Sequence, residues 1–360
     1  MSNKRDEIQQ ELIDKISKNF TGIHRISIRT GKCRIYLKSI QEHSKNCISN
    51  PKILILYPNI DIKKSWVDEC IKLDYFPDIT YSTYISVDKV KDENWDYILC
   101  DEAHLIPEEN ILPKIGELIQ RHSNTILASG TYSMDTLFAL SSATNMDLNI
   151  AYSTDQAIED GIVNNFNVFV HTYQLDNTTK RWFGKIKKWE STEAKECARL
   201  SNRVMNSSGE SKKFAALNRM RFINSCDSLI NSVNKWINSN KDQRFLLFAG
   251  DENIGKKYNI PMYNSKSKND DVLKEFQEGV INQLCLIKKG GAGITYPNLN
   301  TILITAINSN GEALEQQIGR SLLMDTDEAN IHIFVSSEPF QQKWLMSSLA
   351  SISNERIKYL

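Results

Sequence analysis

The chain has 360 residues and carries 44 lysines and arginines against 44 aspartates and glutamates, so its formal net charge is zero. This length predicts about two domains. A composition of 41% hydrophobic and 24% charged residues is typical of a soluble globular protein and excludes disorder over most of the chain. The neutral balance gives no sign of a wholly basic, nucleic-acid-binding domain.

The compartment is predicted from the N-terminus and the cysteines. Residues 1–10 are polar, no apolar h-region follows them, and no apolar run is long enough to cross a bilayer, so no membrane association is expected. The seven cysteines are scattered and include no C-x-x-C pair. This pattern indicates reduced thiols and a cytoplasmic protein. The histidines do not cluster with the cysteines, so no zinc site is predicted.

The first part of the chain alternates between two periodicities. Residues 5–19 place apolar side chains on one face of a helix. Apolar runs that predict buried strands follow at 26–28, 53–57, 97–100 and 125–128. Helical patterns lie between them at 34–40, 62–73 and 111–122. This alternation favours a parallel sheet with helices on both faces.

A second alternation begins near residue 240. Its strands are predicted at 244–249, 284–287, 301–305 and 331–335, and its helices at 271–278 and 312–322. The intervening stretch contains an extended strand at 165–175 and a polar segment at 179–240 with one helix over 214–237. That segment is either a solvated connector or an insertion that faces nucleic acid. We therefore predict an α/β protein with domains 1–160 and 241–360 and a connector at 161–240.

The most specific motif is Asp101-Glu102-Ala103-His104, which directly follows the apolar run 97–100. Carboxylates at the carboxyl end of a parallel strand lie where α/β sheets bind ligands. One carboxylate can hold Mg²⁺, and the other can orient a water molecule for attack on a γ-phosphate. The tetrapeptide alone is a weak signal, but its position after a buried strand strengthens it.

A second motif, residues 28–33, contains Gly31-Lys32 between a predicted strand and a predicted helix. Backbone N–H groups and a helix N-terminus can cradle phosphates there, and lysine can reach the β- and γ-phosphates, as in a P-loop. The match to G-x-x-x-x-G-K-[ST] is incomplete. Its first glycine is missing, and Cys33 stands where a hydroxyl would bind Mg²⁺. A thiol is a poor ligand for this hard cation.

Taken together, these motifs resemble the superfamily 2 helicases and translocases, especially DEAH-box, restriction-subunit-like and SNF2-like members from phages and viruses. The further segments that carry the resemblance occur in family order: Gln9, 53–69, Ser82-Thr83, Ser129-Gly130-Thr131, 244–252, 286–304 and 315–323. A literal Ser-Ala-Thr at 142–144 follows a helix-like stretch and is taken as coincidence. The resemblance implies two RecA-like parallel-sheet lobes joined by a helical connector.

The resemblance also implies roles for individual residues, with ATP and Mg²⁺ as cofactors. Catalysis is assigned to Lys32, Asp101 as the Mg²⁺ ligand, Glu102, Gln316 and Arg320, the last as an arginine finger from the second lobe. ATP binding is assigned to Gln9, Arg29, Thr30, Gly31, Lys32, Cys33 and Gly319. Coupling is assigned to His104, Ser129 and Thr131. Nucleic-acid contacts are assigned to Asn59, Thr83, Lys288, Gly291 and Gly293.

The predicted function is an ATP-dependent helicase or translocase that hydrolyses ATP between two lobes and moves along or remodels DNA. Single-stranded or branched DNA is the expected partner, and RNA is the alternative. Two departures, Cys33 and Leu323 in place of a second arginine, leave open a degenerate core that binds nucleic acid or a protein partner with little ATP turnover. The short chain also leaves open the motor subunit of a larger restriction or replication complex. A phage-encoded protein would act in the host cytoplasm.

Overall fold

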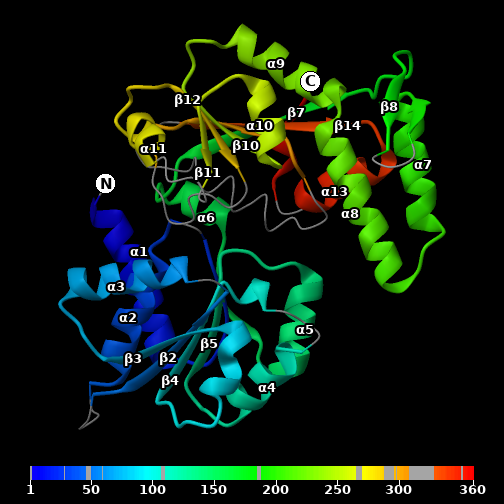
Figure 1. The fold of residues 1–360 in the computed structure, drawn as a ribbon. Helices are drawn as coiled ribbons and strands as arrows, with labels where there is room; N and C mark the ends of the chain where they lie inside the picture. Colours follow the sequence, from blue (N-terminus) through cyan, green and yellow to red (C-terminus); the bar gives the residue numbers. More distant parts are fainter. Residues whose placement is uncertain are drawn as a thin grey trace. The chain divides into compact units, whose positions relative to one another are not determined.

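The computed structural model describes residues 2–27, 29–45, 50–58, 60–106, 110–184, 188–264, 270–287, 296, 298–307, 328–349 and 352–360. It divides into two compact units, residues 1–164 and 165–360. Figure 1 shows both units in sequence colours. None of the helices in these ranges is long and apolar enough to cross a membrane.

Unit 1 is a parallel sheet covered by helices. Its strands are β1 (Gly22–Ile26), β2 (Lys52–Tyr57), β3 (Asp78–Thr83), β4 (Tyr97–Asp101), β5 (Thr125–Ser129) and β6 (Leu148–Tyr152). Its helices are α1 (Ser2–Lys18), α2 (Lys32–His43), α3 (Asp61–Leu73), α4 (Leu112–Gln120), α5 (Met134–Thr144) and α6 (Thr154–Glu159), with 3-10 turns at Tyr84–Lys89 and Ala103–Leu105. The strand order is β3-β2-β4-β5-β1-β6. Helices α1 to α3 lie on one face, and α4 and α5 lie on the other (Figure 1).

The strands of unit 1 form because both of their faces are buried. Every residue of β4 and β5 is buried, so these strands read as continuous apolar runs rather than as an alternating pattern. The first strand differs from the prediction. The run at 26–28 predicted its position, but β1 occupies Gly22–Ile26. His24 and Arg25 interrupt the apolar pattern of this strand although His24 is fully buried, and this moved the prediction toward the C-terminus.

Unit 2 is also a parallel sheet. Its strands are β7 (Asn165–Tyr173), β10 (Phe245–Ala249), β11 (Met262–Asn264), β12 (Gln283–Ile287), β13 (Thr301–Ile304), β14 (Glu328–Ser336) and β15 (Ile357–Tyr359), in the order β11-β12-β10-β13-β14-β7-β15. A separate antiparallel hairpin joins β8 (Arg181–Phe183) to β9 (Trp189–Ser191). The helices are α7 (Glu193–Met205), α8 (Gly209–Ser225), α9 (Asp227–Ser239), α10 (Glu252–Gly255), α11 (Asp270–Gln277) and α13 (Pro339–Leu349), with 3-10 turns at Lys256–Tyr258 and Asn354–Arg356.

Most of the region predicted as a connector, residues 165–240, belongs to unit 2. Its strand β7 pairs with β14 along nine residues, so residues 165–173 are part of the second sheet. The helix predicted over 214–237 is two helices, because Cys226 adopts an extended conformation between α8 and α9. Helix α9 then packs Leu229, Ile230 and Val233 against the sheet core. The helix predicted at 312–322 lies outside the described residues.

A buried histidine pair in unit 2 predicts acid sensitivity. His171 Nε2 lies 2.9 Å from His332 Nδ1. Burial, reinforced by the neighbouring His171, lowers the pKa of His332 from 6.5 to about 3, and burial also lowers the pKa of His171. As the pH falls through 6.5, these two histidines therefore take up protons in the unfolded chain but stay neutral in the folded unit. The free energy of unfolding should fall as the pH drops from 7, by about 2 kcal/mol at pH 5 from His332 alone.

Urea unfolding of the parent and of His332→Gln at pH 7, 6 and 5 measures this effect. The glutamine variant should lose most of the pH dependence in the unfolding transition of unit 2. His122→Gln, the same change in unit 1, serves as the control and should leave that transition unaltered. An equal pH dependence in the parent and in His332→Gln would contradict the prediction.

Candidate functional site

Three loops of unit 1 meet at the carboxyl edge of its sheet. They follow β1, β4 and β5, which are adjacent strands in the order β4-β5-β1. Because parallel strands share one carboxyl edge, the sheet brings together the loop before Lys32, the acidic pair after Cys100 and the segment at Ser129. These are the sequence motifs predicted to carry the chemistry of unit 1.

The loop before α2 has the conformation of a tight cradle. Arg29 and Gly31 both have positive φ, at 67° and 93°. A side chain on residue 31 would be strained, and its Cβ would lie 2.6 Å from Gln9 Nε2, so only glycine fits there. Gln9 donates from Nε2 to the Thr30 carbonyl at 2.7 Å, and Arg5 donates to the Arg29 carbonyl at 2.6 Å. Helix α1 thus fixes the loop, and α2 begins at Lys32 with its N-terminus at the site.

The acidic pair is held in place from several directions. Trp66 Nε1 donates to Asp101 Oδ2 at 2.8 Å, and the Tyr84 hydroxyl donates to the Asp101 carbonyl at 2.6 Å. Glu102 has a positive φ of 53°, a strained conformation for a residue with a side chain. Its Oε1 lies 3.6 Å from Lys32 Nζ. The end of β4 and the start of α2 therefore present two carboxylates and one ammonium group to the same point.

Burial makes this group of charges electrostatically unbalanced. Desolvation, together with the negative charge of Glu102, raises the pKa of Asp101 from 3.8 to about 6. Burial alone would lower the pKa of Lys32, but Glu102 and Asp101 outweigh it and raise that pKa above its usual value. One ammonium group thus faces two carboxylates, and burial makes one of them, Asp101, resist ionisation. Such a site favours additional positive charge, which a divalent cation would supply.

His104 lies between the acidic pair and the end of β5. His104 Nδ1 lies 3.5 Å from Glu102 Oε2 and 2.7 Å from Ser129 Oγ. The Ser129 hydroxyl donates its proton to the Thr131 carbonyl at 2.8 Å and accepts from the Thr131 N–H at 3.1 Å. A hydroxyl has one proton, so His104 Nδ1 donates to Ser129. A change at Glu102 can therefore reach residues 129–131 through two contacts.

Two buried polar atoms beside these loops bear on whether a nucleotide fits the site. The hydroxyls of Thr30 and Thr131 are buried and have no hydrogen-bond partner among the described residues. Buried groups of this kind are usually satisfied by water, an ion or a ligand. No cluster of three metal-binding side chains occurs in the described part of the chain. A single carboxylate suits Mg²⁺, which usually binds one or two carboxylates and completes its shell with water and substrate phosphates. The residues present fit a magnesium–nucleotide group.

Cys33 is the least suitable of the predicted nucleotide ligands. Burial and the negative charge of Asp101 raise the pKa of its thiol well above 9.0. The side chain therefore stays protonated, and a neutral thiol binds Mg²⁺ poorly. It is the second residue of α2, whereas the prediction placed it in the loop before a helix that begins at residue 34.

The structure brings together ten of the predicted residues in unit 1: Gln9, Arg29, Thr30, Gly31, Lys32, Cys33, Asp101, Glu102, His104 and Ser129, with Thr131 joined through Ser129. Thr83 ends β3 at the same edge of the sheet and donates to Ser86 Oγ at 3.1 Å. Seven predicted residues lie outside the described residues: Asn59, Lys288, Gly291, Gly293, Gln316, Gly319 and Arg320.

Sequence reasoning missed three residues that shape the site. Arg5 supports the loop before α2, and Trp66 and Tyr84 hold Asp101. The side chain of Trp66 is fully buried. Its ring stacks on Tyr36 at 6.5 Å. Nothing in the sequence distinguishes a buried tryptophan that donates to a carboxylate from one that only packs.

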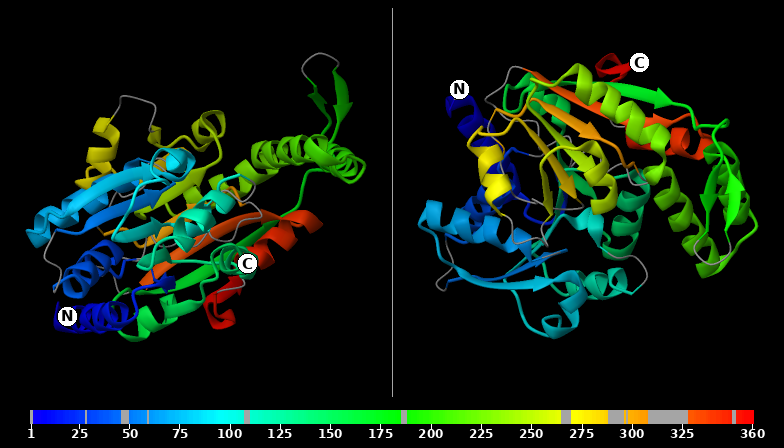
Figure 2. Two further views of the ribbon diagram at one scale, coloured as in Figure 1. Left: turned by 90° about the horizontal axis from the view of Figure 1, so that it is seen from below. Right: turned by 45° about the horizontal axis from the view of Figure 1, so that its top comes forward.

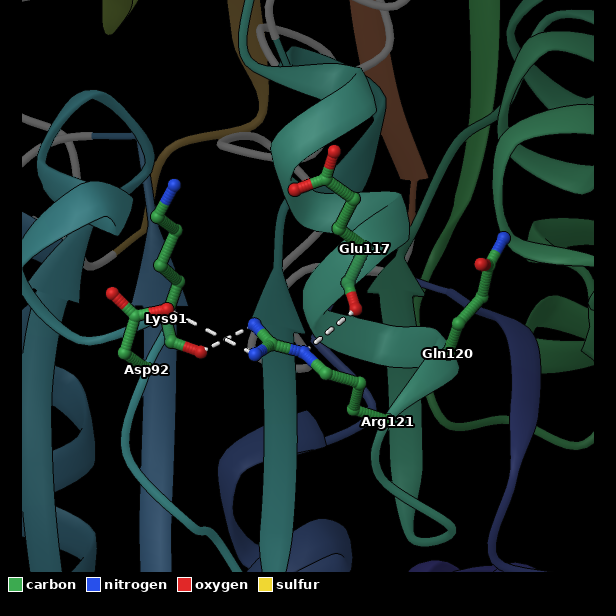
Figure 3. A pocket seen from close by; sticks show the side chains of 5 residues that line it. All are labelled: Lys91, Asp92, Glu117, Gln120 and Arg121. Carbon is green, nitrogen blue, oxygen red and sulfur yellow. Dashed lines mark hydrogen bonds and ion pairs between the residues drawn. The ribbon is translucent and has the colours of Figure 1, made fainter.

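A pocket in unit 1 lies at the opposite, amino-terminal edge of the sheet. Figure 3 shows its lining residues Lys91, Asp92, Glu117, Gln120 and Arg121. Arg121 Nη2 donates to the Lys91 carbonyl at 2.6 Å, and its Nε donates to the Glu117 carbonyl at 3.2 Å. The arginine thus joins the end of α4 to the segment before β4. Since ligands of parallel α/β sheets bind at the carboxyl edge, this pocket is not the candidate site.

Comparison with known proteins agrees with the fold. Residues 215–322 match the family described as helicase conserved C-terminal domain. A variant of S. cerevisiae Dbp5 bound to RNA and ADP BeF3 is similar with a TM-score of 0.61 at 10% identity, over 98% of this chain and 89% of that chain. The DEAD-box helicase Mss116 bound to ssRNA and UDP-BeF gives 0.57 at 16% identity, over 98% and 74%. No curated protein matches the chain.

These findings confirm the predicted fold class. The chain forms two parallel-sheet α/β lobes that match the RecA-like lobes of helicase cores. The family match in unit 2 and the fold of both units support the predicted resemblance to superfamily 2 helicases. The DEAH subtype and a phage origin stay predictions.

Proposed function

We propose that this protein is a nucleic-acid-dependent ATPase that acts as a superfamily 2 helicase or translocase. The observation that carries the proposal is the array at the carboxyl edge of sheet β3-β2-β4-β5-β1-β6. There, Lys32 lies 3.6 Å from Glu102 at the start of a helix, and Glu102 is linked through His104 to Ser129. Phosphate binding, water activation and signal transfer need these three kinds of group in contact.

Each residue has a defined task in this proposal. Lys32 and the N-terminus of α2 bind and orient phosphate oxygens, and Asp101 holds Mg²⁺. Glu102 orients the attacking water and accepts its proton. Gln9 positions the base-binding side of the loop, and His104 with Ser129 and Thr131 transmits the state of the site. Bound ATP supplies the phosphoryl bond that is cleaved, and Mg²⁺ neutralises the phosphate charge.

The role that we propose for unit 2 is inferred from its sequence motifs. Gln316, Gly319 and Arg320 are proposed to complete the phosphate site, with Arg320 stabilising the charge of the transition state. Asn59, Thr83, Lys288, Gly291 and Gly293 are proposed to contact the nucleic acid. The similar structures of Dbp5 and Mss116 contain RNA, which supports a nucleic-acid partner. We keep single-stranded or branched DNA as the proposed partner and RNA as the alternative.

Cys33 favours a second candidate function, a core that binds nucleotide and nucleic acid with little turnover. Its protonated thiol replaces the hydroxyl that would help to hold Mg²⁺, and Leu323 replaces a predicted arginine. Cys33→Ser separates the two functions. A motor that is only slowed by its thiol should gain activity in this variant, whereas a core without turnover should remain inactive.

Phosphate release measured with single-stranded DNA, duplex DNA, forked DNA and RNA side by side tests the proposed function. The expected result is hydrolysis that at least one of these nucleic acids stimulates several-fold over the protein alone. Hydrolysis that none of them stimulates would refute the helicase or translocase assignment. The ranking of the four substrates identifies the partner.

Trp66→Phe tests the positioning of Asp101. The phenyl ring keeps most of the packing but removes the N–H that donates to Asp101 Oδ2 at 2.8 Å. That hydrogen bond lowers the pKa of Asp101, so its loss should raise this pKa further and weaken the carboxylate as an Mg²⁺ ligand. A hydrogen bond to a charged group is worth about 1.5–3 kcal/mol, so the Mg²⁺ concentration for half-maximal hydrolysis should rise roughly ten-fold or more.

Trp95→Phe is the matched control. Trp95 is also buried in unit 1, and its Nε1 donates to the Val90 carbonyl at 3.0 Å, away from the acidic pair. Both variants should lose similar stability in urea unfolding, while the Mg²⁺ requirement changes only in Trp66→Phe. If both variants need the same Mg²⁺ concentration for half-maximal hydrolysis, Trp66 has only a structural role.

A further inference from the structure

The positive charge of this neutral chain is concentrated in one segment of unit 2. Residues 180–221, which we call the basic arm, contain twelve lysines and arginines against four glutamates, a net charge of +8. The remaining residues therefore carry a net charge of −8. The arm comprises the β8–β9 hairpin, α7 and most of α8, and nearly all of it precedes the family match that begins at residue 215.

The arm projects from the sheet of unit 2 as a preformed structure. The figures show the hairpin, α7 and the first turns of α8 at the periphery of this unit (Figure 1, Figure 2). The chain enters the arm from the carboxyl end of β7. Lys288, Gly291 and Gly293, the predicted nucleic-acid contacts, follow β12 in the chain, and β12 is parallel to the other strands of this sheet. The arm therefore starts at the edge from which these contacts are also expected.

Three arginines of the arm are used to build it. Arg181 Nη1 lies 3.0 Å from Glu193 Oε1, and that buried carboxylate also accepts from the Asp227 N–H at 2.7 Å. Arg199 donates to Glu196 at 2.6 Å and lies over the ring of Trp189. The guanidinium of Arg219 lies 3.8 Å from the ring centre of Phe340. These contacts anchor the hairpin and α8 to the rest of unit 2.

Other lysines and arginines of the arm make no such structural contacts in the part of the chain that the structure describes. Lys188, Lys195, Arg203, Lys212 and Arg221 are exposed and form no ion pair with the described residues. On α7, Lys195, Arg199 and Arg203 follow one another at intervals of four residues, which places them on one face at steps of about 6 Å. The opposite face of α7 buries Cys197, Leu200 and Val204. Arg199 is paired with Glu196, so Lys195 and Arg203 are the two on this face that stay available to a polyanion.

An aromatic side chain accompanies the cations. Trp182 lies in β8 opposite Glu190 and is 70% exposed. Its neighbours on the other face of the hairpin are used in packing, since Phe183 contacts Phe222 at 5.7 Å and Trp189 donates to Glu196 at 3.0 Å. Exposed cations and an exposed aromatic ring in one segment are the combination that binds single-stranded nucleic acid, through phosphates and base stacking.

We propose that the basic arm is an additional binding surface for single-stranded nucleic acid. Exposed cations of α7 and α8 contact the phosphates, and Trp182 stacks on an unpaired base. The proposal rests on the proposed function because it assumes that the protein acts on nucleic acid. It assigns the arm, and not the motif loops alone, as a part of unit 2 that holds the strand. It also selects the nucleic-acid-facing insertion over the solvated connector.

Fluorescence anisotropy of a labelled 20-nucleotide DNA strand, without nucleotide and from 50 to 200 mM salt, tests the proposal. The arm variant combines Lys195→Gln, Arg203→Gln and Lys212→Gln. The control combines Lys235→Gln, Lys241→Gln and Lys274→Gln, three exposed lysines of unit 2 outside the arm. Removal of three phosphate contacts should lower the slope of log K against log salt by about 2 and the affinity at 0.1 M salt on the order of 100-fold. The control should bind like the parent.

Trp182→Ala is the second variant, and its exposed side chain can be removed without disturbing the core. It should weaken binding roughly ten-fold with an unchanged salt slope, because stacking releases no counterions. Equal affinities and slopes for the arm variant and the control would overturn the inference, as would a parent protein that does not bind the strand. If the arm variant loses binding although no nucleic acid stimulates hydrolysis, the arm is a binding site and the motor function is wrong.

Discussion

The Glu102→Gln variant is expected to bind nucleotide like the parent and to hydrolyse it roughly 10²- to 10⁴-fold more slowly. The amide has nearly the shape of the carboxylate, so the strained backbone at this position and the neighbouring His104 are retained. It cannot accept a proton from water. Because the positive partner Lys32 is kept and one negative charge is removed, the affinity for an anionic nucleotide should not fall.

Single-turnover hydrolysis and equilibrium nucleotide binding, measured on the same preparation, check this result. Glu117→Gln makes the same chemical change at the opposite edge of the sheet, on the exposed face of α4, and should hydrolyse at the parent rate. A Glu102→Gln variant with the parent rate would remove Glu102 from the chemistry and leave the second candidate function.

Lys32→Ala should abolish both tight nucleotide binding and hydrolysis. Its ammonium group is the only cation shown within 4 Å of Glu102 among the described residues, apart from the imidazole of His104 if that is protonated. Its removal leaves two carboxylates that repel a phosphate. The loss of one preorganised group on the reacting charge usually costs on the order of 10²- to 10³-fold in rate. Lys38→Ala, two turns further along the same helix, is the matched control.

The double variant Lys32→Ala, Glu102→Gln separates folding from function. Lys32 and Glu102 form a partly buried pair, and the loss of one partner should cost about 1–2 kcal/mol of unfolding free energy, between the values for surface and buried pairs. Removal of both partners should restore much of that stability in urea unfolding but none of the hydrolysis. Recovery of hydrolysis together with stability would mean that Lys32 acts only on folding.

Much of the fold was predictable because the inner strands are buried on both faces. β2, β4, β5, β10 and β12 were predicted within one or two residues, since full burial demands unbroken apolar runs. The missed strands of the two main sheets are β3, β6, β11 and β15, and these are the four edge strands. Edge strands pack less apolar surface, so their sequences are more polar or shorter and resemble loops.

The sheet to which the strand at 165–173 belongs could not be predicted, for a different reason. Residues 165–173 lie next to the first unit in the sequence but pair with residues 328–336, far along the chain. No local pattern specifies such a partner. The break at Cys226 was also missed, since apolar residues continue at helical spacing across it and only the packing of α8 and α9 shows two helices.

The sequence by itself determined the motifs, their order and the edge of the sheet to which each belongs, because buried runs and strand-end residues are local properties. Only the tertiary structure decided which groups touch. It placed Lys32 against Glu102, tied Glu102 through His104 to Ser129, and added Trp66 as the donor to Asp101. It also divided the cations of the arm into those that hold the fold and those left for a ligand. These outcomes depend on distances between residues remote in the chain, which periodicity and composition do not encode.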